Sequence, residues 1–157
     1  MTFTIEGYDA KYQQAFYDLN VAWLEEFFAV EPIDQKVLSD PQRYIIDEGG
    51  EILFAVENGK AIGTVAMKSM GPGRYELTKL GVDQSARKGG IGAALCEGVI
   101  TRFKARAGDT LFLETNTLLE NAIRLYWKLG FVELPNPVPS PYQRSNYYME
   151  WQDGTPP

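Results

Sequence analysis

The segment Arg87-Lys88-Gly89-Gly90-Ile91-Gly92 holds the residues of this sequence best suited to bind an anion. Two cations stand beside three glycines, and an apolar helix pattern begins directly afterwards. The first backbone N–H groups of a helix have no partner within the helix, and the helix dipole places partial positive charge there. We interpret the segment as an anion site for a pyrophosphate. The alternative is that the glycines only turn the chain between a strand and a helix.

Two better-known phosphate-binding motifs are excluded. A dinucleotide-binding Gly-x-Gly-x-x-Gly/Ala pattern that starts at Gly90 and Gly92 would reach Leu95, where it requires glycine or alanine. A P-loop ends in Gly-Lys-Ser or Gly-Lys-Thr, and the chain contains neither. The predicted anion site is therefore of another kind.

The absence of histidine limits the chemistry that the chain can perform. It excludes Ser-His and Cys-His catalytic pairs and the usual zinc ligand sets, so no metal site is expected. Any proton transfer must use a carboxylate, a tyrosine, a lysine or water. The one cysteine, Cys96, falls inside the predicted helix and is expected to be a small buried residue rather than a nucleophile.

Length and composition predict one soluble domain over residues 1–157, with a frayed tail at 154–157. No apolar run is long enough to span a membrane, and the start of the chain has no basic segment typical of secretion, so we expect a cytoplasmic protein without a membrane partner. The net charge of −6 argues against nucleic acid as a partner and favours a cationic substrate. The oligomeric state stays open, with a homodimer as one option.

The first part of the chain predicts a strand, two helices and a β-hairpin. Apolar residues recur at three- and four-residue steps in the longer helix, and an Asn-Gly pair between two apolar runs is a strong hairpin signal. The predicted elements are a strand over Thr2 to Glu6, a helix over Ala10 to Val30, a short helix over Ile33 to Leu38, and hairpin strands over Ile52 to Val56 and Ala61 to Met67.

The next predicted strand, Tyr75 to Val82, leads into the glycine-rich segment. Since side chains alternate along a strand, Glu76, Thr78 and Leu80 are expected to share one face. Gly81 interrupts the strand. It indicates either a β-bulge, which would leave an N–H group without a partner, or a position where a neighbouring group needs the space.

The last part of the chain predicts two helices and three strands. A short apolar run after the first helix suits a strand parallel to its predecessor, because a crossover helix joins the two. The predicted elements are a helix from Ile91 to Phe103, a strand over Leu111 to Thr115, a helix over Leu119 to Leu129, a strand over Phe131 to Leu134, a stiff loop over Pro135 to Pro141, and a strand over Asn146 to Trp151.

Two motifs together resemble the GCN5-related N-acetyltransferase (GNAT) superfamily. Arg87-x-x-Gly90-x-Gly92 matches its acetyl-CoA signature, and Asn121-Ala122-Ile123-Arg124-Leu125-Tyr126-Trp127-Lys128-Leu129-Gly130-Phe131 matches its downstream Asn-x-x-x-x-Tyr-x-x-x-Gly-Phe pattern. The order of the predicted elements also matches over nearly the whole chain. The resemblance implies an α/β fold with a mixed sheet of about seven mostly antiparallel strands, splayed between the fourth and fifth strands, and about four helices.

The resemblance also implies how acetyl-CoA is held, as a co-substrate. Backbone N–H groups from Arg87 to Gly92, across Lys88, Gly89, Gly90 and Ile91, would bind the CoA pyrophosphate. The backbone of Leu80-Gly81-Val82 would pair with the pantetheine arm and place an N–H group on the thioester oxygen. Asn121 matches the position that contacts the cofactor arm. Tyr126 matches the position that protonates the leaving thiolate, although without the family it would be interpreted as a core aromatic residue.

A base is required as well, because an amine such as that of lysine has a pKa near 10.4 and must lose a proton before it attacks. Glu76 is the first candidate, since the family often places a base on the fourth strand on the face assigned to Leu80. Glu114 on the next strand is the second candidate. Each could act through water, and each could instead be an ordinary strand-end carboxylate.

The acceptor end would be built from the junction after the first helix, with Phe28 and Glu31, and from the proline-rich loop with Tyr142 and Arg144. Arg144 suits a substrate carboxylate, whereas the acidic surface suits a cation. An amino acid or peptide-like amine that carries both charges would satisfy the two.

These observations predict an N-acetyltransferase that moves the acetyl group of acetyl-CoA to a primary amine by direct attack in a ternary complex. The amine could be a small molecule, an amino acid or a peptide. One alternative is a catalytically silent module that binds acyl-CoA and regulates a partner. Another is an acyltransferase that uses a longer acyl chain.

Overall fold

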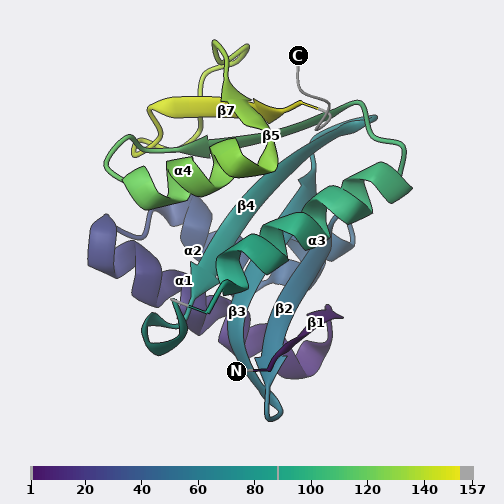
Figure 1. The fold of residues 1–157 in the computed structure, drawn as a ribbon, viewed down its shortest axis with the longest axis vertical. Helices are drawn as coiled ribbons and strands as arrows, with labels where there is room; N and C mark the ends of the chain where they lie inside the picture. Colours follow the sequence, from purple (N-terminus) through teal and green to yellow (C-terminus); the bar gives the residue numbers. More distant parts are fainter. Residues whose placement is uncertain (1, 88, 153–157) are drawn as a thin grey trace.

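The structure is a computed structural model that describes residues 2–87 and 89–152 (Figure 1). The strands are β1 (Thr4–Gly7), β2 (Glu51–Glu57), β3 (Lys60–Ser69), β4 (Arg74–Val82), β5 (Thr110–Thr115), β6 (Phe131–Glu133) and β7 (Tyr147–Trp151). The α-helices of the described residues are α1 (Gln13–Phe27), α2 (Pro32–Ser39), α3 (Ile91–Ala105) and α4 (Glu120–Leu129). The predicted tail at 154–157 and the predicted ligand residue Lys88 lie outside the described residues.

The described strands form one mixed sheet in the order β1-β2-β3-β4-β5-β7-β6. Every recorded pair is antiparallel except β4 with β5, which is parallel. That parallel pairing joins Arg74–Glu76 to Thr110–Phe112 and extends no further along the described residues of the two strands. Beyond it, the ends of β4 and β5 diverge. The expected seven-stranded sheet with a splay between the fourth and fifth strands is confirmed.

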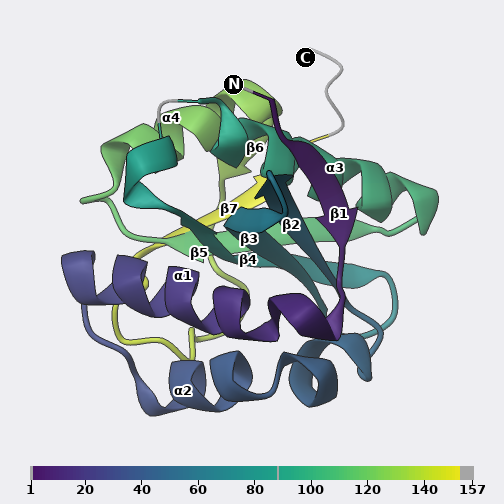
Figure 2. The same ribbon diagram turned by 90° about the horizontal axis from the view of Figure 1, so that it is seen from below.

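Helices cover both faces of the sheet (Figure 2). On one face, α3 and α4 pack on an apolar cluster that includes Leu77, Leu95 and Leu113. On the other face, α1 and α2 pack on a second cluster that includes Phe16, Phe54 and Ala66. We call these the α3 face and the α1 face. The sheet therefore separates two cores, and the splay between β4 and β5 is where the sheet opens between its two faces.

A β-bulge in β4 changes which side chains share a face. Thr64 of β3 pairs with Gly81 and Ala66 pairs with Thr78, so Lys79 and Leu80 together stand opposite Val65. Lys79 is the bulged residue and has a left-handed φ of 56°. Leu77 packs in the cluster of the α3 face, which places Glu76 and Thr78 on the α1 face.

Beyond the bulge the alternation is reversed, because Leu80 and Val82 pack against the cluster of the α3 face. The expectation that Glu76 and Leu80 share a face is therefore wrong. Gly81 itself is in regular register. A Cβ atom added at Gly81 would lie 3.0 Å from the carbonyl oxygen of Leu19, so the second interpretation of this glycine, space for a neighbour, is the one observed.

The segment before the sheet differs from the predicted long helix. The expected helix over 10–30 is a short 3₁₀ turn at Ala10–Tyr12 followed by α1, which ends at Phe27. Pro32 does not merely interrupt a helix but begins α2, where the missing N–H group of proline costs nothing. A π-helical turn at Gln42–Ile46 has no clear sequence signal. Within the described residues, no helix combines the length and hydropathy needed to cross a bilayer.

Candidate functional site

A cavity of about 390 Å³ lies where β4 and β5 separate. Its lining comes from both faces of the sheet, so the cavity runs through the splay. The α3 end of the cavity is lined by Leu80, Val82, Gly92, Asn121, Leu125 and Tyr126. The α1 end is lined by Trp23, Phe28, Glu76, Lys79, Tyr142 and Arg144. The two ends differ in chemistry, the first being mostly apolar and the second mostly charged and aromatic.

The start of α3 has the features of an anion site. Gly90 is the N-cap, with a left-handed φ of 74° and no side-chain cap. A Cβ atom at this position would meet nothing within 4 Å, so the backbone conformation, rather than lack of space, requires glycine. The N–H groups of the first turn, Ile91–Ala93, have no carbonyl partner within the helix. The N–H group of Gly89, two residues before Ile91, is already used, since it donates to the carbonyl oxygen of Ala86 at 3.2 Å.

Arg87 lines the cavity, but its guanidinium forms an ion pair near the end of α1. It donates two hydrogen bonds to the carboxylate of Glu26, at 2.8 and 3.1 Å, and its Nε donates to the carbonyl oxygen of Val82 at 3.3 Å. The ion pair is partly exposed, so its contribution to stability is small. An anion at this end would therefore be held mainly by backbone N–H groups.

Tyr126 enters the cavity from α4 and is 7% exposed. Its ring packs edge-on against Phe131, with centroids 5.9 Å apart. Burial raises the pKa of the Tyr126 hydroxyl above its usual value, and the neighbouring thiol of Cys96 adds to this, so the hydroxyl keeps its proton at neutral pH. Cys96 is fully buried, as predicted, and burial raises the pKa of its thiol to about 12. A thiol in that state is a poor nucleophile.

Glu76 and Glu114 both line the cavity, as the sequence predicts for a base. Glu76 is 7% exposed, and none of the recorded hydrogen bonds of the described residues involves its side chain. Burial raises the pKa of Glu76 to about 7, and the negative charge of Glu114 contributes, against the opposing charges of Lys79, Lys68 and Arg74. One carboxylate oxygen of Glu114 is also buried without a hydrogen-bond partner among the described residues.

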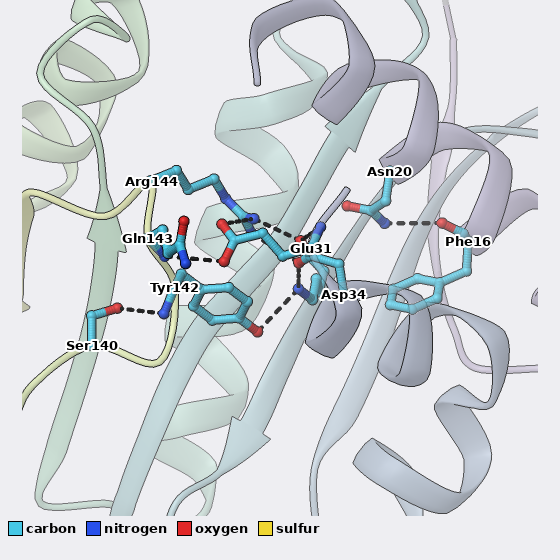
Figure 3. A network of polar contacts seen from close by, with 9 residues as sticks. Phe16, Asn20, Glu31, Asp34, Ser140, Tyr142, Gln143 and Arg144 are labelled. Carbon is cyan, nitrogen blue, oxygen red and sulfur yellow. Dashed lines mark hydrogen bonds and ion pairs between the residues drawn. The ribbon is translucent and has the colours of Figure 1, made fainter. Parts of the chain in front are cut away.

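The α1 end of the cavity is held together by an ionic network around Asp34 (Figure 3). Asp34 is fully buried and accepts hydrogen bonds from Lys79 Nζ at 2.6 Å and from Arg144 at 2.6 and 2.8 Å. Burial alone would raise its pKa, but the hydrogen bonds from Arg144 and the charge of Lys79 lower it to about 2. Arg144 also donates to Glu31 at 3.1 Å, and Lys79 to the hydroxyl of Tyr142 at 3.1 Å.

This network links three segments that are far apart in the chain. Glu31 and Asp34 form a capping box at the start of α2, since the backbone N–H of Glu31 donates to Asp34 at 3.0 Å. Lys79 is the bulged residue of β4, and Tyr142 and Arg144 belong to the loop before β7. Figure 3 shows Arg144 turned toward the two carboxylates from this loop, while the hydroxyl of Tyr142 accepts from Lys79. The bulge turns the Lys79 side chain toward α2, where it meets Asp34.

The predicted acceptor residues are only partly where the sequence places them. Phe28, Tyr142 and Arg144 line the cavity, but Glu31 does not. Glu31 instead holds the loop through Arg144 and the backbone N–H of Gln143. Arg144 already pairs with the carboxylates of Glu31 and Asp34, so a substrate carboxylate would have to compete with them.

Lys79 and Asp34 belong to the site but were not predicted from the sequence. Asp34 had one local signal, since it stands three residues after Glu31 at a proline-marked helix start. Lys79 had none, because a lysine between Thr78 and Leu80 reads as a solvated strand position. No group of three or more potential ligands for a metal ion occurs among the described side chains.

Comparisons with known proteins agree with the fold described above and with the resemblance found in the sequence. The sequence profile of the family described as "Acetyltransferase (GNAT) family" matches residues 13–131. The chain belongs to the GNAT family. Its match therefore includes α1, the bulged strand β4, the glycine-rich turn and α4.

Among relatives, an uncharacterized N-acetyltransferase of Schizosaccharomyces pombe is 27% identical over 126 residues, which cover 75% of this chain and 77% of that protein. A GNAT-family acetyltransferase from Staphylococcus aureus Mu50 has a similar fold, with a TM-score of 0.85, 22% identity, and coverage of 96% of this chain and 98% of that one. YncA from Salmonella typhimurium, solved with acetyl-CoA, has a TM-score of 0.72, 18% identity, and coverage of 97% and 94%.

Proposed function

We propose that this GNAT protein transfers the acetyl group of acetyl-CoA to a primary amine by direct attack in a ternary complex. Bound acetyl-CoA supplies an acetyl thioester, which an amine can attack directly. The presence of acetyl-CoA in the similar YncA structure supports the choice of co-substrate. The observation that carries the proposal is the buried Glu76, whose pKa near 7 suits a general base, in one cavity with the protonated Tyr126.

The α3 end of the cavity fits a pyrophosphate and an extended pantetheine arm. The unpaired N–H groups at Ile91–Ala93 and the open space at Gly90 suit phosphate oxygens. The edge of β4 that faces β5 is unpaired beyond Glu76, so backbone groups over 80–82 can pair with the amides of the arm. An N–H group there can also stabilise the charge that develops on the thioester oxygen. Asn121 lines the same end and can bind the arm through its amide.

Proton transfer is divided between the two faces of the sheet. On the α1 face, Glu76 accepts a proton from the ammonium group of the acceptor, whose nitrogen then bonds to the carbonyl carbon. A carboxylate with a pKa near 7 is ionised to a useful extent at neutral pH and still binds a proton well. On the α3 face, Tyr126 donates its proton to the thiolate that leaves when the carbon–sulfur bond breaks. The splay is what allows both groups to reach one reacting centre.

The test is release of free thiol from acetyl-CoA in the presence of a panel of primary amines, with the acetylated product identified by mass spectrometry. The proposal predicts stoichiometric thiol and acetylamine with at least one amine. A silent acyl-CoA-binding module would bind CoA in calorimetry but release no thiol. An acyltransferase for longer chains would have a higher kcat/KM with butyryl-CoA than with acetyl-CoA. Either result would replace the proposal by that alternative.

A further inference from the structure

We propose that the acceptor is a diamine, whose distal ammonium group pairs with Glu114 while Glu76 takes the proton from the amine that is attacked. This inference rests on the proposed acetyl transfer and narrows the class of amine. It follows from how charges are paired and unpaired along the cavity wall.

Each cation that lines the described part of the cavity already has an anionic partner. Lys79 pairs with Asp34 at 2.6 Å, Arg144 pairs with Asp34 and Glu31, and Arg87 pairs with Glu26. The two cations of the α1 end, Lys79 and Arg144, are balanced by the two carboxylates of the network. No cation among the described lining residues is therefore left to bind a substrate carboxylate, which disfavours an amino acid with a free α-carboxylate.

The two carboxylates that line the cavity have the opposite status. Glu76 is 7% exposed without a recorded hydrogen bond to a described residue, and one oxygen of Glu114 is buried without a partner. A buried polar group without a partner costs about 1–3 kcal/mol, and more when it is charged. An ammonium group brings up to three donors and a positive charge, so it can satisfy the buried oxygen of Glu114 and can also pair with the carboxylate of Glu76.

The register of the strands places these carboxylates on one face at separate positions. Glu76 stands opposite Phe112 in the parallel pair, and Glu114 lies two residues further along β5. Phe112 and Glu114 are two residues apart on β5, so their side chains point to the same face and their Cα atoms are roughly 7 Å apart. Glu76 and Glu114 can therefore hold two nitrogen atoms of one extended ligand. Glu114 has the oxygen that is buried without a partner among the described residues, so we assign the distal ammonium group to this carboxylate.

The rest of the α1 end suits the hydrocarbon part of such a ligand. Trp23, Leu24 and Phe28 line the cavity from the end of α1. These side chains offer an apolar wall for a methylene chain, and the aromatic faces attract ammonium groups. Charged ends with an apolar middle are the features of a short aliphatic diamine.

Steady-state kinetics with three matched amines tests the inference. Diaminobutane carries both ammonium groups, butylamine lacks the second, and ornithine has both plus a carboxylate. We expect kcat/KM for diaminobutane to exceed that for each of the others by roughly tenfold or more, the value of one charged hydrogen bond. Glu114→Gln should bring the ratio of diaminobutane to butylamine close to one. Glu133→Gln, which changes an exposed carboxylate on the edge strand β6, should leave the ratio unchanged.

Calorimetry of diaminobutane and butylamine with the CoA-loaded protein gives a readout that does not need turnover. We expect tighter binding of the diamine in the wild type and equal binding of the two amines in Glu114→Gln. Equal kcat/KM for butylamine, or a preference for ornithine, would overturn the inference while leaving acetyl transfer intact. Absence of thiol release with all amines would refute the proposed function, and the calorimetric comparison would still decide whether Glu114 binds a second ammonium group.

Discussion

The two ends of the cavity are built by different means. At the α3 end, the proposed anion site is made of backbone N–H groups in one short segment, and its special residue is Gly90, which has a φ of 74°. The α1 end is held by side chains from α2, β4 and the loop before β7, which meet around the buried Asp34. A local segment can form the anion site, whereas the network around Asp34 exists only when distant parts of the chain have folded together.

Removal of the proposed acid at the α3 end should have the largest effect. Tyr126→Phe keeps the packing against Phe131 but removes the proton for the leaving thiolate. We expect kcat to fall roughly 10²–10⁴-fold, the usual contribution of general acid catalysis, with little change in the Kd for acetyl-CoA. The control is Tyr17→Phe on α1, outside the cavity. An unchanged kcat in Tyr126→Phe would remove the acid role from this residue.

Disruption of the network at the α1 end should affect stability more than chemistry. Asp34→Asn leaves the buried Lys79 and the partly buried Arg144 without their shared counter-charge, and we expect the free energy of unfolding in urea to fall by about 3–5 kcal/mol. The matched control is Glu51→Gln, because Glu51 also holds two arginines, Arg102 and Arg106, but on the surface. That change should cost less than about 1 kcal/mol.

The same network should also make stability depend on pH. The pKa of Asp34 is lowered from 3.8 to about 2, so its contribution is present above pH 4 and is lost as the pH falls through about 2. The difference corresponds to roughly 2 kcal/mol. Urea titrations between pH 2 and pH 5 should show this loss in the wild type but not in Asp34→Asn. Equal pH dependence in the two proteins would contradict the assignment.

Gly90→Val tests the backbone origin of the α3 end. The variant places a β-branched residue at φ 74°, where it has room but not the right conformation. We expect the affinity for CoA in calorimetry to fall at least about tenfold as the turn changes shape. Gly59→Val is a matched control, because Gly59 has a φ of 76° and equal space in the β2–β3 turn, far from the cavity. If both variants kept full affinity, the turn would not be the pyrophosphate site.

The smallest expected effect is the shift that Glu114→Gln should cause in the pH profile of kcat/KM, apart from its larger effect on the preference for a diamine. The charge of Glu114 is the second cause of the raised pKa of Glu76, after burial. Its removal should move the acid limb of kcat/KM to lower pH by about one unit or less. An acid limb that moved to higher pH would show that Glu114 acts on Glu76 in another way.

The difference between the two ends explains what the sequence could predict. The element order follows from hydrophobic periodicity and turn residues, which are local signals, whereas the splayed mixed sheet was expected from the resemblance carried by the paired motifs. The turn at Gly90 follows from the glycine-rich segment, and the place of Tyr126 in the site follows from the same resemblance. The end of the long first helix was harder to predict. The helix ends at Phe27, with Phe28 as its C-cap, before the proline that was expected to interrupt it.

The α1 end could not be predicted in the same manner. Period-two alternation places Glu76 and Leu80 on one face, but the bulge at Lys79 adds a residue opposite Val65 and reverses the face from there on. Nothing in the sequence around Lys79 marks this bulge, since the glycine that suggests one is Gly81, two residues later. The pairing of Arg144 with Asp34 spans 110 residues and becomes visible only in the folded chain.

The pH dependence of kcat/KM for the amine, measured for the wild type and for Glu76→Gln, tests the central claim most directly. In the wild type, kcat/KM should rise with pH through an inflection near pH 7, because Glu76 must lose its proton before it can accept one from the acceptor. In Glu76→Gln the activity should be much lower and this inflection should be absent. The same inflection in both proteins would show that the base is another group and would contradict the account.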